Sequence, residues 1–290
     1  MEINGMDSLI VKKMIAEYYS IFNTLRQRGL NFKEENPISK VVSAKDKIYE
    51  GLKGRSFRKV LRTIYSSQGL SKLELSKKLA ISVDALNEIL ITIKETNAAL
   101  VRSNPPIYYP KPGAIYEVTF EWFVAELLKR ELSGISSFGV KLLNLRYGGD
   151  YDVVSRLGDV LLYVECKSGN INNIDKKEIL HYFQRDEELS PDLSILLIDS
   201  DNMPDSFKQK YAEAFREYVD KKIHILPRIR RNNGMGVFYE GHGTEYIVTA
   251  EGNLLSNLRL AVDHYVRFVK RYGLIGPGDE EIKRHYDVYE

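Results

Sequence analysis

The chain has 290 residues, of which 43% are hydrophobic and 28% are charged, a composition typical of one or two globular domains and not of a disordered chain. Its formal net charge of +2 does not by itself indicate a nucleic-acid partner, and no apolar run is long enough to cross a membrane. The single cysteine, Cys166, excludes an internal disulfide and a zinc site built from several cysteines.

The start of the chain has the spacing of an amphipathic helix. Apolar side chains recur at near-helical intervals over residues 7–31, and a polar linker containing Pro37 follows. We interpret residues 1–52 as a helical segment with its linker. Because Met1–Lys13 lacks the longer apolar stretch of a signal peptide, we expect a cytoplasmic protein.

The next stretch has the rhythm of a small helical domain. A basic helix is expected over residues 55–66, a second after Ser71, with Glu74 closing a capping box, and a third after Ser82. Residues 97–109 can then form a short two-stranded wing. This pattern resembles a winged helix-turn-helix domain, which implies substrate binding or dimerisation.

We set the bounds of this domain at residues 53–112, and its beginning is rich in cations. The basic side chains there are Lys53, Arg55, Arg58, Lys59 and Arg62. Such a cluster can lie along a phosphate backbone, although a solvated surface face is the alternative. The third helix is acidic on balance, with Asp84, Glu88 and Glu95, which disfavours entry into the major groove. The domain is therefore expected to contact DNA in a non-standard way, to bind protein or to dimerise.

From Tyr116 the pattern becomes that of an α/β domain. The expected order is a helix over 116–132, three strands, a helix over 174–189 and a strand. The strands are expected at residues 140–146, 150–154, 160–167 and 193–199. The remaining expected elements are a helix over 206–220, a strand over 223–226, a hairpin over 237–248 and a helix over 253–272. We assign residues 113–230 to the α/β core and residues 231–290 to an extension with a hairpin and a helix.

Charged side chains stand at the end of an otherwise apolar strand. Because side chains alternate along a strand, Glu165 and Lys167 share one face, and the neighbouring strand can bring Asp152 beside Glu165. Two close carboxylates repel each other, and a hard divalent cation such as Mg²⁺ or Mn²⁺ relieves this repulsion. The backbone carbonyl of Cys166 and the carboxylate of Glu121 are further candidate ligands. Lys167 is suited to stabilise charge on a phosphate.

The run of Asp152, twelve intervening residues and Glu165-Cys166-Lys167 resembles the PD-(D/E)xK motif of restriction-endonuclease-like nucleases. The element order over about residues 113–200 is similar to the core of that superfamily, and the acid of the first helix resembles the family's helical acid. The resemblance implies an α/β fold with a restriction-endonuclease-like core and hydrolysis of phosphodiester bonds that depends on Mg²⁺ or Mn²⁺. It implies catalytic roles for Asp152, Glu165, Lys167 and Glu121. The motif position before Asp152 holds Tyr151 in place of proline.

Several alternatives stay open. Glu165 and Lys167 can instead form an ion pair on a wet sheet face, and Asp150 can replace Asp152 as the ligand. Arg185, on the helix after the motif strand, can hold a phosphate or pair with a neighbouring acid. The primary hypothesis is a DNA endonuclease; the alternatives are a non-catalytic DNA-binding or regulatory protein and a protein-interaction module. An RNA substrate is also open, as is a homodimer, which is suggested by analogy alone.

Overall fold

The computed structural model describes residues 21–34, 40–43, 46–143, 145–147, 149–219, 228–231, 237–240 and 244–269. Within the helix expected over 7–31, residues 7–20 lie outside this description and residues 21–27 are helical. The prediction that the helix continues to residue 31 is wrong. Gly29 adopts a left-handed φ of 75°, and the Leu30 N–H bonds to the Leu25 carbonyl at 3.0 Å, which ends the helix. The chain then enters the strand β1 (Asn31–Glu34).

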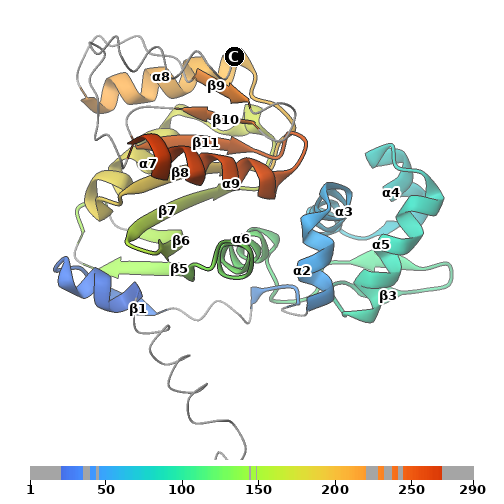
Figure 1. The fold of residues 1–290 in the computed structure, drawn as a ribbon. Coiled ribbons are helices and arrows are strands. Elements are labelled where there is room, and N and C mark those ends of the chain that lie inside the picture. Colours follow the sequence, from blue (N-terminus) through green and yellow to red (C-terminus); the bar gives the residue numbers. More distant parts are fainter. Residues whose placement is uncertain are drawn as a thin grey trace, which may run out of the picture.

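A helical unit with a small sheet follows, drawn from blue to teal in Figure 1, and we call it the N-terminal helical unit. Its elements are α2 (Asp46–Lys53), α3 (Arg55–Tyr65), β2 (Leu70–Ser71), α4 (Lys72–Leu79), α5 (Val83–Glu95), β3 (Leu100–Arg102) and β4 (Ile107–Tyr109). Both expected caps are confirmed: Ser71 and Glu74 form a capping box, and Ser82 accepts a bond from the Ala85 N–H. The two strands expected over 97–109 are present as β3 and β4, which pair antiparallel, and β2 adds a third strand that was not expected. Helix α2 was not expected and packs against α3 and α5.

The other described strands form one mixed sheet of eight strands in the order β1-β5-β6-β7-β8-β11-β10-β9. The strands after β1 are β5 (Ile135–Leu143), β6 (Gly149–Leu157), β7 (Val160–Lys167), β8 (Leu193–Ile198), β9 (Arg228–Arg231), β10 (Val237–Glu240) and β11 (Glu245–Thr249). The pairs β7–β8 and β8–β11 are parallel, and the other neighbours are antiparallel. Since β7 and β8 are parallel, their carboxyl ends meet at the same edge of the sheet.

Helices cover both faces of this sheet (Figure 1), which makes the protein a mixed α/β fold. The covering helices are α6 (Tyr116–Leu132), α7 (Lys176–Leu189), α8 (Asp205–Val219) and α9 (Leu254–His264). Val164 of β7 shares a hydrophobic core with α6 and α9, whereas its neighbour Tyr163 shares the opposite core with α7 and α8. No helix in the described part of the chain is long and apolar enough to span a membrane.

The strand boundaries differ from expectation mainly in β5 and β6. The strand expected over 140–146 begins and ends earlier, at Ile135 and Leu143, and the strand expected over 150–154 extends at both ends, from Gly149 to Leu157. The hydroxyls of Ser136 and Ser155 explain part of this difference, because they bond each other at 2.7 Å inside the sheet. Polar residues that satisfy each other across two strands do not show an apolar pattern. The strand expected over 223–226 lies outside the described residues. Of the helix expected over 253–272, the described part is α9, continued by a π-helical turn, η3 (Tyr265–Val269).

Candidate active site

The pairing between strands β6 and β7 ends just before Asp152 and Glu165. Their antiparallel ladder ends with the pair Val153–Val164, and the next facing positions are Asp152 and Glu165. There, a carboxylate oxygen of Asp152 accepts a hydrogen bond from the backbone N–H of Cys166 at 2.7 Å. The Asp152 side chain thus satisfies a strand donor and is held beside the motif residues of β7.

A local distortion of β6 accompanies this parting. Tyr151 packs in the core under α7, whereas Val153 packs in the core under α6, although residues two apart on a regular strand share a face. Gly139 of β5, at the register position opposite Asp152, has a left-handed φ of 58° that glycine adopts without steric cost. Asp152 therefore lies where the strand changes the face that its side chains occupy.

Glu165 is almost completely buried, with 2% of its surface exposed. Its carboxylate accepts a hydrogen bond from the Tyr163 hydroxyl, and Nη1 of Arg185 lies 3.0 and 2.8 Å from its two oxygens. Burial alone would raise the pKa of Glu165, but the charges of Lys167 and Arg185 and the hydrogen bonds from Tyr163 and Lys167 together outweigh burial and lower that pKa. Glu165 is therefore ionised at neutral pH and held by two cations.

The ammonium group of Lys167 lies between two acids. Its Nζ is 3.1 Å from Oε1 of Glu165 and 3.1 Å from Oε2 of Glu178, a residue of α7. Burial acts to lower the pKa of Lys167, but the charge of Glu165, the hydrogen bonds to Glu165 and Glu178 and the charge of Asp152 together outweigh it, and the pKa is raised. Lys167 therefore stays protonated beside the carboxylates.

Glu121 and Asp152 differ from Glu165, because their pKa values are raised whereas that of Glu165 is lowered. Burial raises the pKa of Glu121 to about 8, and the charges of Glu165 and Asp150 add to this rise. The pKa of Asp152 is raised well above its usual range by burial and by the charges of Glu165 and Glu121. The three carboxyls thus influence one another, which is the electrostatic situation that a bound dication relieves.

All four residues that the motif assigned to catalysis line a single cleft of about 1050 Å³. The cleft is bordered by α6, by the strand ends and by α7, and Arg62 of the N-terminal helical unit also lines it. Its acidic lining residues are Glu117, Glu121, Asp150, Asp152, Glu165 and Glu178, against the basic residues Lys40, Arg62, Lys167 and Arg185. These carboxyls supply the oxygen donors that hard cations prefer.

The basic residues expected at a phosphate backbone mostly contact other protein groups. Lys53 pairs with Glu131 at 2.7 Å, Arg55 and Lys59 pair with Asp201, and Arg58 pairs with Asp199. Arg58 is 1% exposed, so its guanidinium is inside the protein and does not face a ligand. Arg62 donates to the carbonyl of Ser168 and is the member of the cluster that lines the cleft.

Two further sequence-predicted residues have defined positions. Arg185 contacts the Glu165 carboxylate, a partner that was not among those considered from the sequence. Asp150 lines the cleft, but its side chain is 57% exposed and lies 3.5 Å from Nζ of Lys141. Glu178 and Tyr163 contact the site through helix α7 and strand β7, and the period-two pattern that placed Glu165 could have indicated Tyr163.

The donor atoms of the site are of the kind that a hard dication prefers, but they are not arranged around a common point. Glu121, Asp152 and Glu165 supply the carboxylate oxygens that Mg²⁺ and Mn²⁺ prefer. Within the described residues, however, no three acidic, histidine or cysteine side chains already surround one point as ligands. The oxygens of Glu165 instead contact Arg185, Lys167 and Tyr163.

Comparison with known proteins adds little to this geometry. No protein-family model matches the chain, and no curated protein matches it. Among solved structures, protein VC1899 from Vibrio cholerae is similar at 15% sequence identity and a TM-score of 0.40. The match covers 69% of this chain and 61% of that chain, so it spans less than two thirds of VC1899. A likeness at this TM-score supports no statement about function.

Proposed function

We propose that this protein is a metal-dependent nuclease that hydrolyses phosphodiester bonds in DNA on a restriction-endonuclease-like core. The observation that carries the proposal is the convergence of Glu121, Asp152 and Glu165 with Lys167 in one cleft, from the separate elements α6, β6 and β7. The order of α6, three strands, α7 and β8 supports the same assignment, since it is the element order of the PD-(D/E)xK core.

Two roles fall to the residues of the cleft, which are binding the metal ion and stabilising charge on the phosphate. Glu121, Asp152 and Glu165 would hold Mg²⁺ or Mn²⁺, and the carbonyl of Cys166 remains a further candidate. When bound, such an ion lowers the pKa of a water molecule and offsets charge on a phosphate. Lys167, kept protonated by Glu165, offers an ammonium group to the same phosphate. Tyr163 and Arg185 orient the Glu165 carboxylate.

The N-terminal helical unit supports a winged-helix-like interpretation through its helices, its caps and its β3–β4 hairpin. We propose that it helps to bind the substrate, chiefly through Arg62 in the cleft, or that it mediates a homodimer. The acidic exposed side chains of α5, such as Asp84 and Glu88, argue against insertion of that helix into a DNA groove.

The first test is cleavage of plasmid, single-stranded and branched DNA, and of RNA, with Mg²⁺ or Mn²⁺. We expect cleavage that EDTA abolishes and added metal restores. Glu165→Gln and Lys167→Met should each lower the rate by about 100-fold or more, because each removes a charge from the reacting centre. The matched control is Lys176→Met, which removes an exposed α7 lysine outside the cleft and should leave the rate unchanged. Full activity of Lys167→Met would refute this site assignment.

A second candidate is a nucleic-acid-binding protein without catalytic activity, which uses the nuclease-like fold as a scaffold. The observation in its favour is the complete engagement of Glu165 by Arg185, Lys167 and Tyr163, as expected for a static ion-pair cluster. Such a protein would bind DNA in a salt-dependent manner and cleave nothing under any metal condition. Binding measured by fluorescence anisotropy alongside the cleavage assay separates the two candidates.

A further inference from the structure

Helix α3 contacts the ends of two neighbouring strands at the edge of the cleft. Arg58 and Arg62 lie four residues apart and therefore on the same side of the helix, about 6 Å apart along its axis. This separation is close to the roughly 4.8 Å between paired strands. Nε of Arg58 lies 2.9 Å from Oδ1 of Asp199, directly after β8, and Arg62 donates to the carbonyl of Ser168, directly after β7.

Asp199 is joined in turn to the backbone of Lys167. The Asp199 N–H donates to the Lys167 carbonyl at 2.8 Å, which closes the ladder between β7 and β8 at its carboxyl end. The backbone of Lys167 is thus bonded to Asp199, the residue that pairs with Arg58. The chain of contacts runs from the N-terminal helical unit to the proposed catalytic lysine through two hydrogen bonds.

The contact between Arg58 and Asp199 is buried and directional. Their side chains are 2% and 3% exposed, and Nη1 of Arg58 also donates to the carbonyls of Leu52 at 2.7 Å and Lys53 at 3.1 Å. An arginine with these bonds has one orientation, and its planar fork cannot be reproduced by a lysine. A buried ion pair of this kind is a weak source of stability but a strong source of geometric definition when its bonds are complete.

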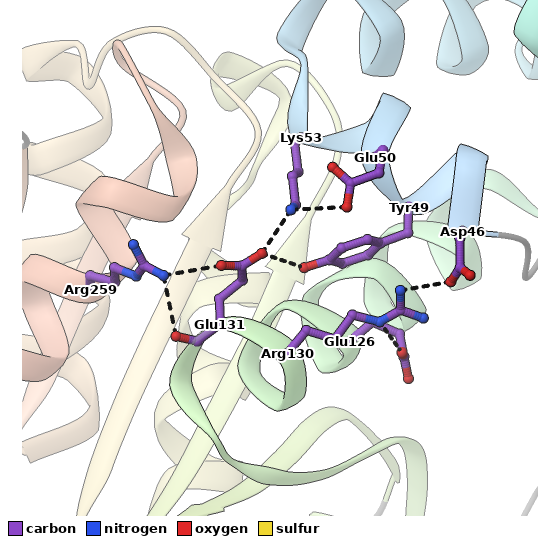
Figure 2. A network of polar contacts seen from close by, with 8 residues as sticks. All are labelled: Asp46, Tyr49, Glu50, Lys53, Glu126, Arg130, Glu131 and Arg259. Carbon is purple, nitrogen blue, oxygen red and sulfur yellow. Dashed lines mark hydrogen bonds and ion pairs between the residues drawn. The ribbon is translucent and has the colours of Figure 1, made fainter.

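A second polar contact joins the same two parts of the protein at another place. Figure 2 shows Glu131 of α6 between Lys53 and Tyr49 of α2, with Arg259 of α9 on its other side. The carboxylate oxygens of Glu131 lie 2.7 Å from Nζ of Lys53, 3.1 Å from the Tyr49 hydroxyl and 3.1 Å from Nη2 of Arg259. None of these four residues lines the cleft. This network therefore provides a comparison in which the two parts are loosened without touching the ends of β7 and β8.

We propose that Arg58 is a positioning residue for Lys167, acting through Asp199, so that α3 of the N-terminal helical unit is part of the active site and not only of a separate binding module. The catalytic part of this proposal rests on the proposed nuclease function, whereas the positioning of Lys167 by Arg58 does not depend on it. Arg58 is buried away from the substrate, so its loss is expected to affect turnover more than substrate binding.

The test compares Asp199→Asn and Arg58→Lys with the control Glu131→Gln. In each protein, kcat and KM are measured, together with the NMR signal of the peptide group between Lys167 and Ser168. Lysine labelled at the carbonyl carbon and serine labelled at nitrogen give a single signal, because Lys167-Ser168 is the only Lys–Ser pair in the chain. We expect both test variants to move this signal and to lower kcat by about 10- to 100-fold with little change in KM. Glu131→Gln should leave the signal and kcat unchanged, even where it lowers the melting temperature.

An unmoved signal in both test variants overturns the proposal, as does an equal movement in Glu131→Gln. A moved signal with unchanged kcat overturns the catalytic part of the proposal. If the unaltered protein cleaves no substrate with either metal, the proposed function fails, and the signal alone then decides whether Arg58 positions Lys167. Should Asp199→Asn not fold, Arg58→Lys, which keeps the positive charge, carries the test.

Discussion

Two largely buried carboxyls, Asp186 of α7 and Glu245 of β11, lie outside the cleft. Burial raises the pKa of Asp186 to about 6 and the pKa of Glu245 to about 8, and the charge of Asp186 contributes to the rise at Glu245. Among the described residues, neither forms an ion pair with a cation. A side-chain hydrogen bond from Ser194 lowers the pKa of Asp186 but does not offset burial. At residue scale, this cluster makes the fold sensitive to pH independently of any catalysis.

The sign of that sensitivity follows from the direction of the pKa shift. A carboxyl with a higher pKa in the folded than in the unfolded chain stabilises the fold at low pH, and the stabilisation is lost as pH rises between the two pKa values. For Glu245 this interval runs from its ordinary value to about 8. Glu245→Gln should therefore raise the melting temperature relative to the unaltered protein at pH 8.5, by roughly 2–4 °C or more, and change it little at pH 5. An equal effect at both pH values would contradict the pKa assignment.

The candidate site shows which residues a sequence can indicate and which it cannot. Period-two alternation and the spacing of the motif brought Asp152, Glu165 and Lys167 together correctly in one cleft, together with the acid on α6. Asp199 and Arg58 were not indicated as partners, because they are 141 positions apart and meet only through the packing of α3 on the sheet. Long-range ion pairs leave no local pattern in a sequence.

At the scale of elements, the sequence predicted correctly those features that depend on interactions between residues close together in the chain. The caps of α4 and α5 and the bounds of β7 follow from short-range bonding and from an unbroken apolar run. Strand β1 was not predicted, because its sequence Asn-Phe-Lys-Glu has one apolar residue and forms a strand only by pairing with β5. Tertiary pairing therefore decided the edge of the sheet.

The two caps differ in a way that stability measurements can resolve. Ser71 takes part in a reciprocal capping box with Glu74, whereas Ser82 accepts a single bond from the Ala85 N–H. Ser71→Ala should lower the free energy of unfolding by about 1 kcal/mol or somewhat more, measured by urea denaturation. Ser82→Ala is the matched comparison and should cost less. A larger loss for Ser82→Ala would show that the reciprocal bond contributes nothing.

At the scale of the whole molecule, the N-terminal helical unit and the sheet share one hydrophobic core. Leu61 of α3, Phe120 of α6 and Val164 of β7 belong to the same buried cluster. Trp122, the single tryptophan of the chain, is 4% exposed in this cluster on α6. A continuous core predicts that both parts unfold together.

Arg58→Ala tests this cooperativity, because it leaves Asp199 buried without a counterion. We expect the free energy of unfolding to fall by about 3–5 kcal/mol. Trp122 fluorescence and far-ultraviolet circular dichroism should still report one coincident transition. The comparison is Lys47→Ala, which removes an exposed pair with Glu95 and should change stability by at most about 1 kcal/mol. Two separated transitions in the unaltered protein would contradict a shared core.

The arginine pair on α3 also limits how this protein can be engineered. Exchanging the whole N-terminal helical unit for a module of a different protein would remove the guanidinium groups that contact Asp199 and Ser168. A chimera would keep Asp152, Glu165 and Lys167 but lose Arg62 from the cleft and the guanidinium that we propose positions Lys167. Changes to the surface of this unit are better made at solvent-facing positions of α5 such as Asp84 and Ile91. Helix α3 should be kept, because its arginines contact the ends of two strands of the sheet.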